Sequence, residues 1–188
     1  MKKLLAFILL FVYFSAKSDD FNLPFYGETL LQYAKPYIYI IDRTQYKTIK
    51  IPEMTESAPV RFVFSDSSLA KKFTPTNYLL SKVNQKLYLT DNLGGAVLEI
   101  QGNKINRIDQ SFEHKMQING QTFTHDHRIF KFGGYGFWSA RNFFTYFDLN
   151  SKEWEAYSPV QGDKLPPGLF DVNHALISLF VQFDHLHD

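Results

Sequence analysis

Short β-type segments that alternate with turns dominate this sequence of 188 residues. The run YIYII at residues 37–41 is separated by polar residues from YKTIKI at 46–51, and KLYLT at 86–90 is separated by DNLGG from AVLEIQ at 96–101. Strands favour β-branched and aromatic residues, while Gly, Asn and Asp between such runs favour tight turns. The pattern therefore predicts an all-β chain of antiparallel meanders.

Composition supports this fold class. Aromatic residues make up 17% of the chain, and charged residues make up 21%, so general disorder is excluded. Helical periodicity is confined to residues 67–73, which Pro75 should end. Residues 19–36, with two prolines and a glycine, are expected to form a mixed lead-in without a strand.

The N-terminus predicts export. Residues 1–18 combine a basic start, eleven apolar residues and small residues at a cleavage position, which is the layout of a signal peptide. Eleven apolar residues are too few to span a bilayer, so we expect no stable membrane insertion after cleavage. Removal of three lysines changes the net charge from +1 to −2, which argues against nucleic acid as a partner. The chain has no Cys, so disulfides and thiol chemistry are excluded, and a bacterial periplasmic or secreted location fits best.

A repeat of about 50 residues is visible. Residues 96–108 align with residues 145–157 at an offset of 49 residues, which brings the turn at 102–103 onto the turn at 151–152. Residues 39–51 form a third, looser copy. A strand pair that recurs at this period is typical of the blades of a β-propeller.

The last copy carries a recognisable motif. An apolar strand ends in a glycine doublet, an aromatic–Asp pair follows, and a Trp stands six residues after the Asp: Gly133, Gly134, Phe147, Asp148 and Trp154. This order resembles the kelch-repeat β-propeller family and is best over residues 115–175, although Phe147 replaces the family's Tyr. The resemblance implies that the glycines allow strands to approach the propeller axis and that Trp154 packs its blade against a neighbour.

The resemblance divides the mature chain, residues 19–188, into part of a propeller. We expect blade-like units at 37–83, 84–113 and 114–160, and the start of a further blade at 165–188. A closed propeller usually has four to eight blades, so about three blades predict an incomplete one. The apolar run at 177–183 should then form an exposed edge strand, through which the chain can associate with itself.

The strongest ligand-binding candidate is the aromatic stretch between two predicted strands. It contains three aromatic rings and two hydrogen-bonding side chains: Tyr135, Phe137, Trp138, Arg141 and Asn142. Aromatic platforms with nearby polar groups suit sugars or peptides. The alternative is that Phe137 and Trp138 fill the core between blades.

Catalytic signals are weak. His125 and His127 stand at i and i+2, so they would share one face of a strand and are weak candidates for metal ligands. Glu153 and Glu155 are expected to face solvent. Propeller enzymes of the galactose oxidase kind need a Cys, and none is present. We expect no cofactor.

The sequence thus predicts an exported, non-catalytic binding or scaffold module that recognises a protein, a peptide or a glycan. One alternative is a small exported enzyme of β-sandwich type, carbohydrate-active or metal-dependent, with His125, Asp126 and His127 in its site. Another is a gene remnant without function.

Overall fold

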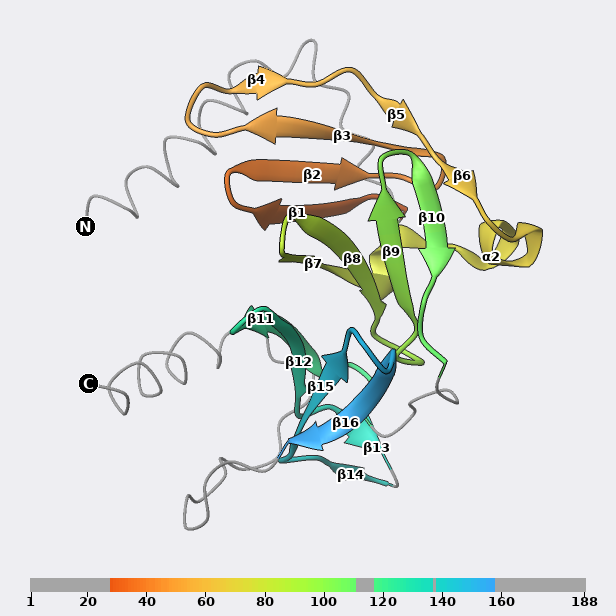
Figure 1. Cartoon of the computed structure of the whole chain (residues 1–188), viewed down its shortest axis with the longest axis vertical. Helices are drawn as coiled ribbons and strands as arrows, with labels where there is room; N and C mark the ends of the chain where they lie inside the picture. Colours follow the sequence, from red (N-terminus) through yellow and green to blue (C-terminus); the bar gives the residue numbers. More distant parts are fainter. Residues whose placement is uncertain (1–27, 111–116, 137, 158–188) are drawn as a thin grey trace.

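The computed structural model describes residues 28–110, 117–136 and 138–157, so the predicted signal peptide and the predicted further blade lie outside the described residues. Nearly all of the regular structure in these ranges is β (Figure 1). The elements are β1 (Leu30–Ala34), β2 (Tyr37–Ile41), β3 (Gln45–Lys50), β4 (Thr55–Glu56), β5 (Val60–Arg61), β6 (Val63–Phe64), α2 (Ser67–Lys72), the 3₁₀ turn η1 (Pro75–Asn77), β7 (Tyr78–Val83), β8 (Lys86–Asp91), β9 (Val97–Gln101), β10 (Lys104–Arg107), β11 (Gln121–His125), β12 (Arg128–Phe132), β13 (Tyr135–Gly136), β14 (Ser139–Ala140), β15 (Phe144–Asp148) and β16 (Glu153–Tyr157).

Three sheets follow one another along the chain. The first sheet has the order β1-β2-β3-β4, with β5 also paired to β3; the second has the order β6-β10-β9-β8-β7; the third has the order β11-β12-β15-β16. A small ribbon, β13–β14, projects from the connection between β12 and β15. All pairings are antiparallel except that of β6 with β10. The prediction of an all-β fold of antiparallel meanders is confirmed at this level.

Strand β1 lies within residues 19–36, which are expected to form a mixed lead-in. It forms a ladder of five residue pairs with β2, in which Leu30 lies opposite Ile41 and Ala34 opposite Tyr37. Burial alternates along β1, as expected for a strand at the edge of a sheet. The strand was missed because Pro36, at its end, sits in the turn rather than interrupting the strand.

Strand β7 also departs from the predicted organisation. Residues 78–83 are predicted to belong to the first unit, but β7 pairs with β8 along its whole length and belongs to the second sheet. The reason is the turn between them, where Asn84 and Gln85 have φ values of 49° and 65°. Two successive positive φ values are typical of a two-residue type I′ hairpin. The change of sheet therefore falls before β7, in the segment that contains α2.

Helix α2 confirms the one predicted helix. Asp66 caps its N-terminus by accepting a hydrogen bond from the Ser68 backbone N–H at 2.9 Å. Lys71 and Lys72 lie in its last turn, where cations favour the helix dipole. The helix ends at Phe73, whose fully buried ring packs between the first two sheets.

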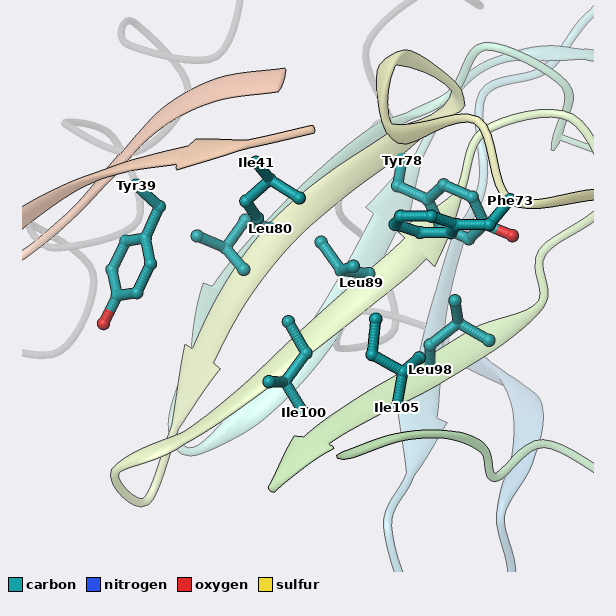
Figure 2. Packing of buried hydrophobic residues seen from close by; sticks show 9 residues of the cluster. All are labelled: Tyr39, Ile41, Phe73, Tyr78, Leu80, Leu89, Leu98, Ile100 and Ile105. Atoms are coloured by element: carbon teal, nitrogen blue, oxygen red, sulfur yellow. The ribbon is translucent and has the colours of Figure 1, made fainter. Parts of the chain in front are cut away.

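The first interface, between the first and second sheets, is an apolar core (Figure 2). Its buried members come from β2, from the connection around η1, and from all four consecutive strands of the second sheet: Tyr39, Ile41, Phe73, Tyr78, Leu80, Leu89, Leu98, Ile100 and Ile105. Burial of this much apolar surface is the main term that stabilises an all-β fold without disulfides.

The second interface, between the second and third sheets, has a smaller apolar cluster. Val83, Tyr88 and Val97 of the second sheet meet Ile129 and Phe147 of the third, and Trp154 packs against them. Strand β7 therefore has a neighbour on each side, because it contacts β1 of the first sheet and β11 of the third. The three sheets thus pack in the order of the chain, with one apolar core between the first and second sheets and another between the second and third.

Candidate functional site

The predicted aromatic stretch forms the ribbon β13–β14, in which Tyr135 lies opposite Ala140 and Gly136 opposite Ser139. Trp138 lies in its turn and is 91% exposed, and Tyr135 is 39% exposed. Trp138 does not fill the core between sheets, which was the alternative expectation for this residue. Phe137 lies outside the described residues.

The backbone at Trp138 is unusual. Its φ is 67°, in the left-handed region that bulky residues rarely adopt. Such a conformation costs on the order of 1 kcal/mol or more and persists where the surrounding structure enforces it. The ribbon therefore holds a large apolar ring in solvent in a defined backbone geometry.

The base of the ribbon is fixed by residues 117 and 118. Ile118 and Tyr135 exchange two backbone hydrogen bonds, of 3.0 and 2.8 Å. The fully buried side chain of Gln117 donates to the Phe143 carbonyl at 3.0 Å and accepts from the Thr145 hydroxyl at 2.6 Å. Gln117 thus connects the start of the third sheet to the end of the ribbon.

Gly134 allows this close approach. Its φ is 86°, and a Cβ at this position would lie 2.6 Å from the carbonyl carbon of Gln117. Its carbonyl accepts a hydrogen bond from the Arg141 N–H at 2.8 Å, which closes the ribbon on the other side. The structure thus places Arg141 at the base of the ribbon, partly buried, and Asn142 beside it, exposed.

Nothing in the sequence marked Gln117 as part of this arrangement. A lone Gln has no motif, and its role depends on the pairing of β12 with β15. The glycine doublet was the available signal, because Gly133 and Gly134 both have positive φ. It predicted a close backbone approach without identifying the other partner.

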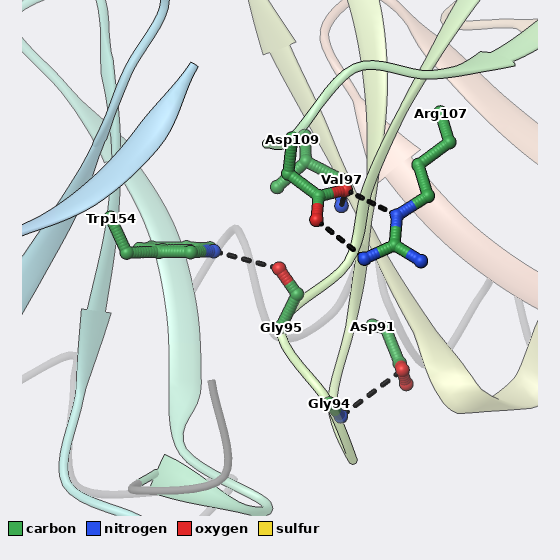
Figure 3. Close-up of polar contacts among 7 residues, drawn as sticks. All are labelled: Asp91, Gly94, Gly95, Val97, Arg107, Asp109 and Trp154. Carbon is green, nitrogen blue, oxygen red and sulfur yellow. Dashed lines mark hydrogen bonds and ion pairs between the residues drawn. The ribbon is translucent and has the colours of Figure 1, made fainter. Parts of the chain in front are cut away.

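Trp154 links the second and third sheets (Figure 3). Its indole N–H donates to the Gly95 carbonyl in the turn between β8 and β9 at 2.7 Å, and its ring lies against Phe147. Asp148 has a different role, because its carboxylate accepts from the Asn150 N–H at 2.7 Å in the turn between β15 and β16.

Near this contact a buried carboxylate supports the second sheet (Figure 3). Asp109 accepts from the Val97 backbone N–H at 2.8 Å and forms a bidentate pair with the Arg107 guanidinium, with distances of 3.0 and 2.7 Å. These contacts hold the end of β10 against β9. Their role is structural, because Val97 and Arg107, which donate these hydrogen bonds to Asp109, both belong to the second sheet.

The two histidines do not share a strand face, so that expectation is wrong. His125 ends β11, while Asp126 and His127 form the two-residue turn to β12, with φ values of 44° and 58°. A type I′ turn reorients the chain, so the i and i+2 side chains no longer point the same way. Within residues 28–110, 117–136 and 138–157, no three His, Asp or Glu side chains lie close enough to hold a metal ion.

Glu153 and Glu155 are exposed, as expected. Glu155 accepts a hydrogen bond from the Tyr146 hydroxyl at 2.8 Å, which raises the pKa of that phenol. In the part of the chain that the structure describes, no helix has the length and apolarity needed to cross a membrane.

Comparison with known proteins gave no assignment: no protein-family model matches the chain, and no curated protein is similar to it.

Proposed function

We propose that this chain is an exported, non-catalytic binding module built from kelch-like blades, and that the ribbon β13–β14 contacts a protein, peptide or glycan ligand. The observation that carries the proposal is Trp138, a 91% exposed ring on a backbone that is fixed at its base. An exposed Trp is a favourable anchor because it supplies a large apolar area at low conformational cost.

The blade assignment rests on three features. Each sheet contains a meander of four antiparallel strands, to which the first sheet adds β5, paired with β3, and the second adds β6 as an edge strand. The first strands of the meanders, β1, β7 and β11, are neighbours in that order. Trp154 joins the third sheet to the second, as the family resemblance implies for this residue. Export is proposed from the signal-like residues 1–18.

The proposal is tested by presenting the mature chain to glycan and peptide arrays, with each hit then titrated by fluorescence. Trp138→Ala should weaken binding at least tenfold and leave the unfolding transition within about 0.5 kcal/mol of the wild type, since an exposed side chain contributes little to stability. Leu93→Ala is the matched control, because Leu93 is also an exposed apolar residue in a turn.

The two variants distinguish a specific contact at Trp138 from nonspecific hydrophobic binding. Binding that survives Trp138→Ala, or that Leu93→Ala weakens equally, would contradict a role for the ribbon. A turnover activity that purifies with the chain would favour the enzyme alternative.

A further inference from the structure

The interior of the second interface contains a lysine. Lys131 of β12 points toward the second sheet, and its exposed fraction is 0%. Its ammonium donates one long hydrogen bond, 3.4 Å, to the Asp91 carbonyl. Two of its three N–H donors have no hydrogen-bond partner among the described residues. A fully buried ammonium with one long hydrogen bond is poorly compensated.

Three further polar groups lie on the segments that border Lys131. Thr122 lies directly opposite Lys131 in the pairing of β11 with β12, and Thr90 and Asn92 flank Asp91 in the chain. Among the residues that the structure describes, Thr90 Oγ1, Asn92 Oδ1 and Thr122 Oγ1 are buried without a hydrogen-bond partner. Native proteins rarely leave buried polar atoms unpaired, so three unpaired atoms on segments that border a poorly compensated ammonium favour a bound species.

The charge at this place identifies the kind of species. Burial lowers the pKa of Lys131 to about 8, while the nearby charge of Asp91 acts in the opposite direction. Lys131 is therefore mainly protonated at pH 7. The Asp91 carboxylate does not contact it, since its two oxygens accept the Leu93 and Gly94 backbone N–H groups at 2.9 and 3.1 Å.

The geometry points to a binding site for a small monovalent anion of the chloride class between the second and third sheets, held by Lys131, Thr90 and Thr122. Each hydroxyl has a proton to donate, and the Asn92 amide can offer its N–H groups by a 180° rotation. A small anion is favoured because Lys131 is fully buried and closely packed, since a Cβ at Gly120 would lie 3.1 Å from Lys131 Cε.

The test is thermal unfolding of the mature chain at pH 7 and constant ionic strength, with chloride or bromide replacing gluconate. Specific binding should raise the Tm of the wild type saturably, by about 3 °C. Lys131→Met removes the positive charge at similar volume and should abolish the halide effect. Lys104→Met is the matched control, since Lys104 is exposed, and it should retain the effect.

Each outcome decides the proposal. A Tm that does not depend on the identity of the anion, or a halide effect that persists in Lys131→Met, would overturn it. Should Lys131→Met not fold, a bromide-soaked crystal of the wild type gives the answer: an anomalous peak beside Lys131 Nζ supports the site. A water molecule at that position without anomalous signal would refute it.

Discussion

The first and second interfaces solve the same packing problem with different chemistry. The buried core of the first consists of nine hydrophobic residues, which include the aromatic rings of Tyr39, Phe73 and Tyr78. The second joins a smaller apolar cluster to a polar end, where the side chains of Gln117, Lys131 and Thr145 are buried. The second interface also carries the base of the Trp138 ribbon.

The difference indicates a division of labour. Apolar burial stabilises without demanding a particular geometry, whereas buried polar groups require defined partners and so specify one arrangement. We infer that the first interface supplies most of the stability and the second sets the geometry of the ribbon.

Two adjacent residues of β9 allow the stability contributions of the two interfaces to be compared directly, because Leu98 faces the first interface and Val97 faces the second. Leu98→Ala should lower the free energy of unfolding by about 3–4 kcal/mol, through lost burial and a residual cavity. Val97→Ala should cost about 2 kcal/mol, since it removes fewer atoms. Chemical denaturation measures both, and a larger loss for Val97→Ala would reverse our view of the two interfaces.

The pH dependence of stability should isolate the polar end of the second interface. Lys131 has a pKa of about 8 in the folded protein and an ordinary pKa near 10.5 when unfolded. The unfolded chain therefore binds more protons between these values, so the free energy of unfolding should rise as the pH rises from about 8 to 10.5, by up to about 3 kcal/mol.

Other groups titrate in the same range, so the measurement compares the wild type with Lys131→Met in halide-free buffer. The rise should appear in the difference between the two curves. If the free energies of unfolding of the two proteins change in parallel with pH, the pKa of Lys131 is not lowered in the folded protein.

Gly134→Ala should disturb the ribbon base. A left-handed φ and a Cβ 2.6 Å from the Gln117 backbone together predict a loss of about 2 kcal/mol. Gly102→Ala is the control, since Gly102 has a φ of 62° but open space around it. Its smaller loss, seen in the same thermal unfolding experiment, reports the backbone conformation alone. Equal losses would mean that the approach to Gln117 contributes nothing.

Trp154→Phe should have the smallest effect, about 1 kcal/mol. Phe keeps most of the ring contact with Phe147 but removes the hydrogen bond to Gly95. Urea unfolding measures the loss, and an unchanged midpoint would show that this hydrogen bond does not stabilise the second interface.

The strand pattern and the short helix were predictable because they depend on local alternation and capping. The change of sheet before β7 was not, since it depends on the turn formed by Asn84 and Gln85. Lys131 illustrates a second limit. In RIFKF the alternation predicts a strand, but both of its faces contain buried residues. The pattern therefore did not reveal that a cation is enclosed.

The aromatic residues of the candidate site could be predicted from the sequence, but the residues that fix the base of the ribbon could not. Trp138 stood out as a large ring beside glycines, whereas Gln117 acts through the register of β12 and β15. The prediction that His125 and His127 share a strand face was wrong for a related reason. It required the strand to continue through Asp126, where the turn begins.

The parallel pairing of β6 with β10 has a consequence for how the protein is made. Val63 lies opposite Lys104 and Phe64 opposite Ile105, so the segment that leaves the first sheet also closes the outer edge of the second. During synthesis β6 must wait for β10 before it can pair. Once β6 is paired, the segment β5–β6 connects the first and second sheets both through the chain and through hydrogen bonds. We therefore expect the two sheets to unfold together and to resist mechanical separation.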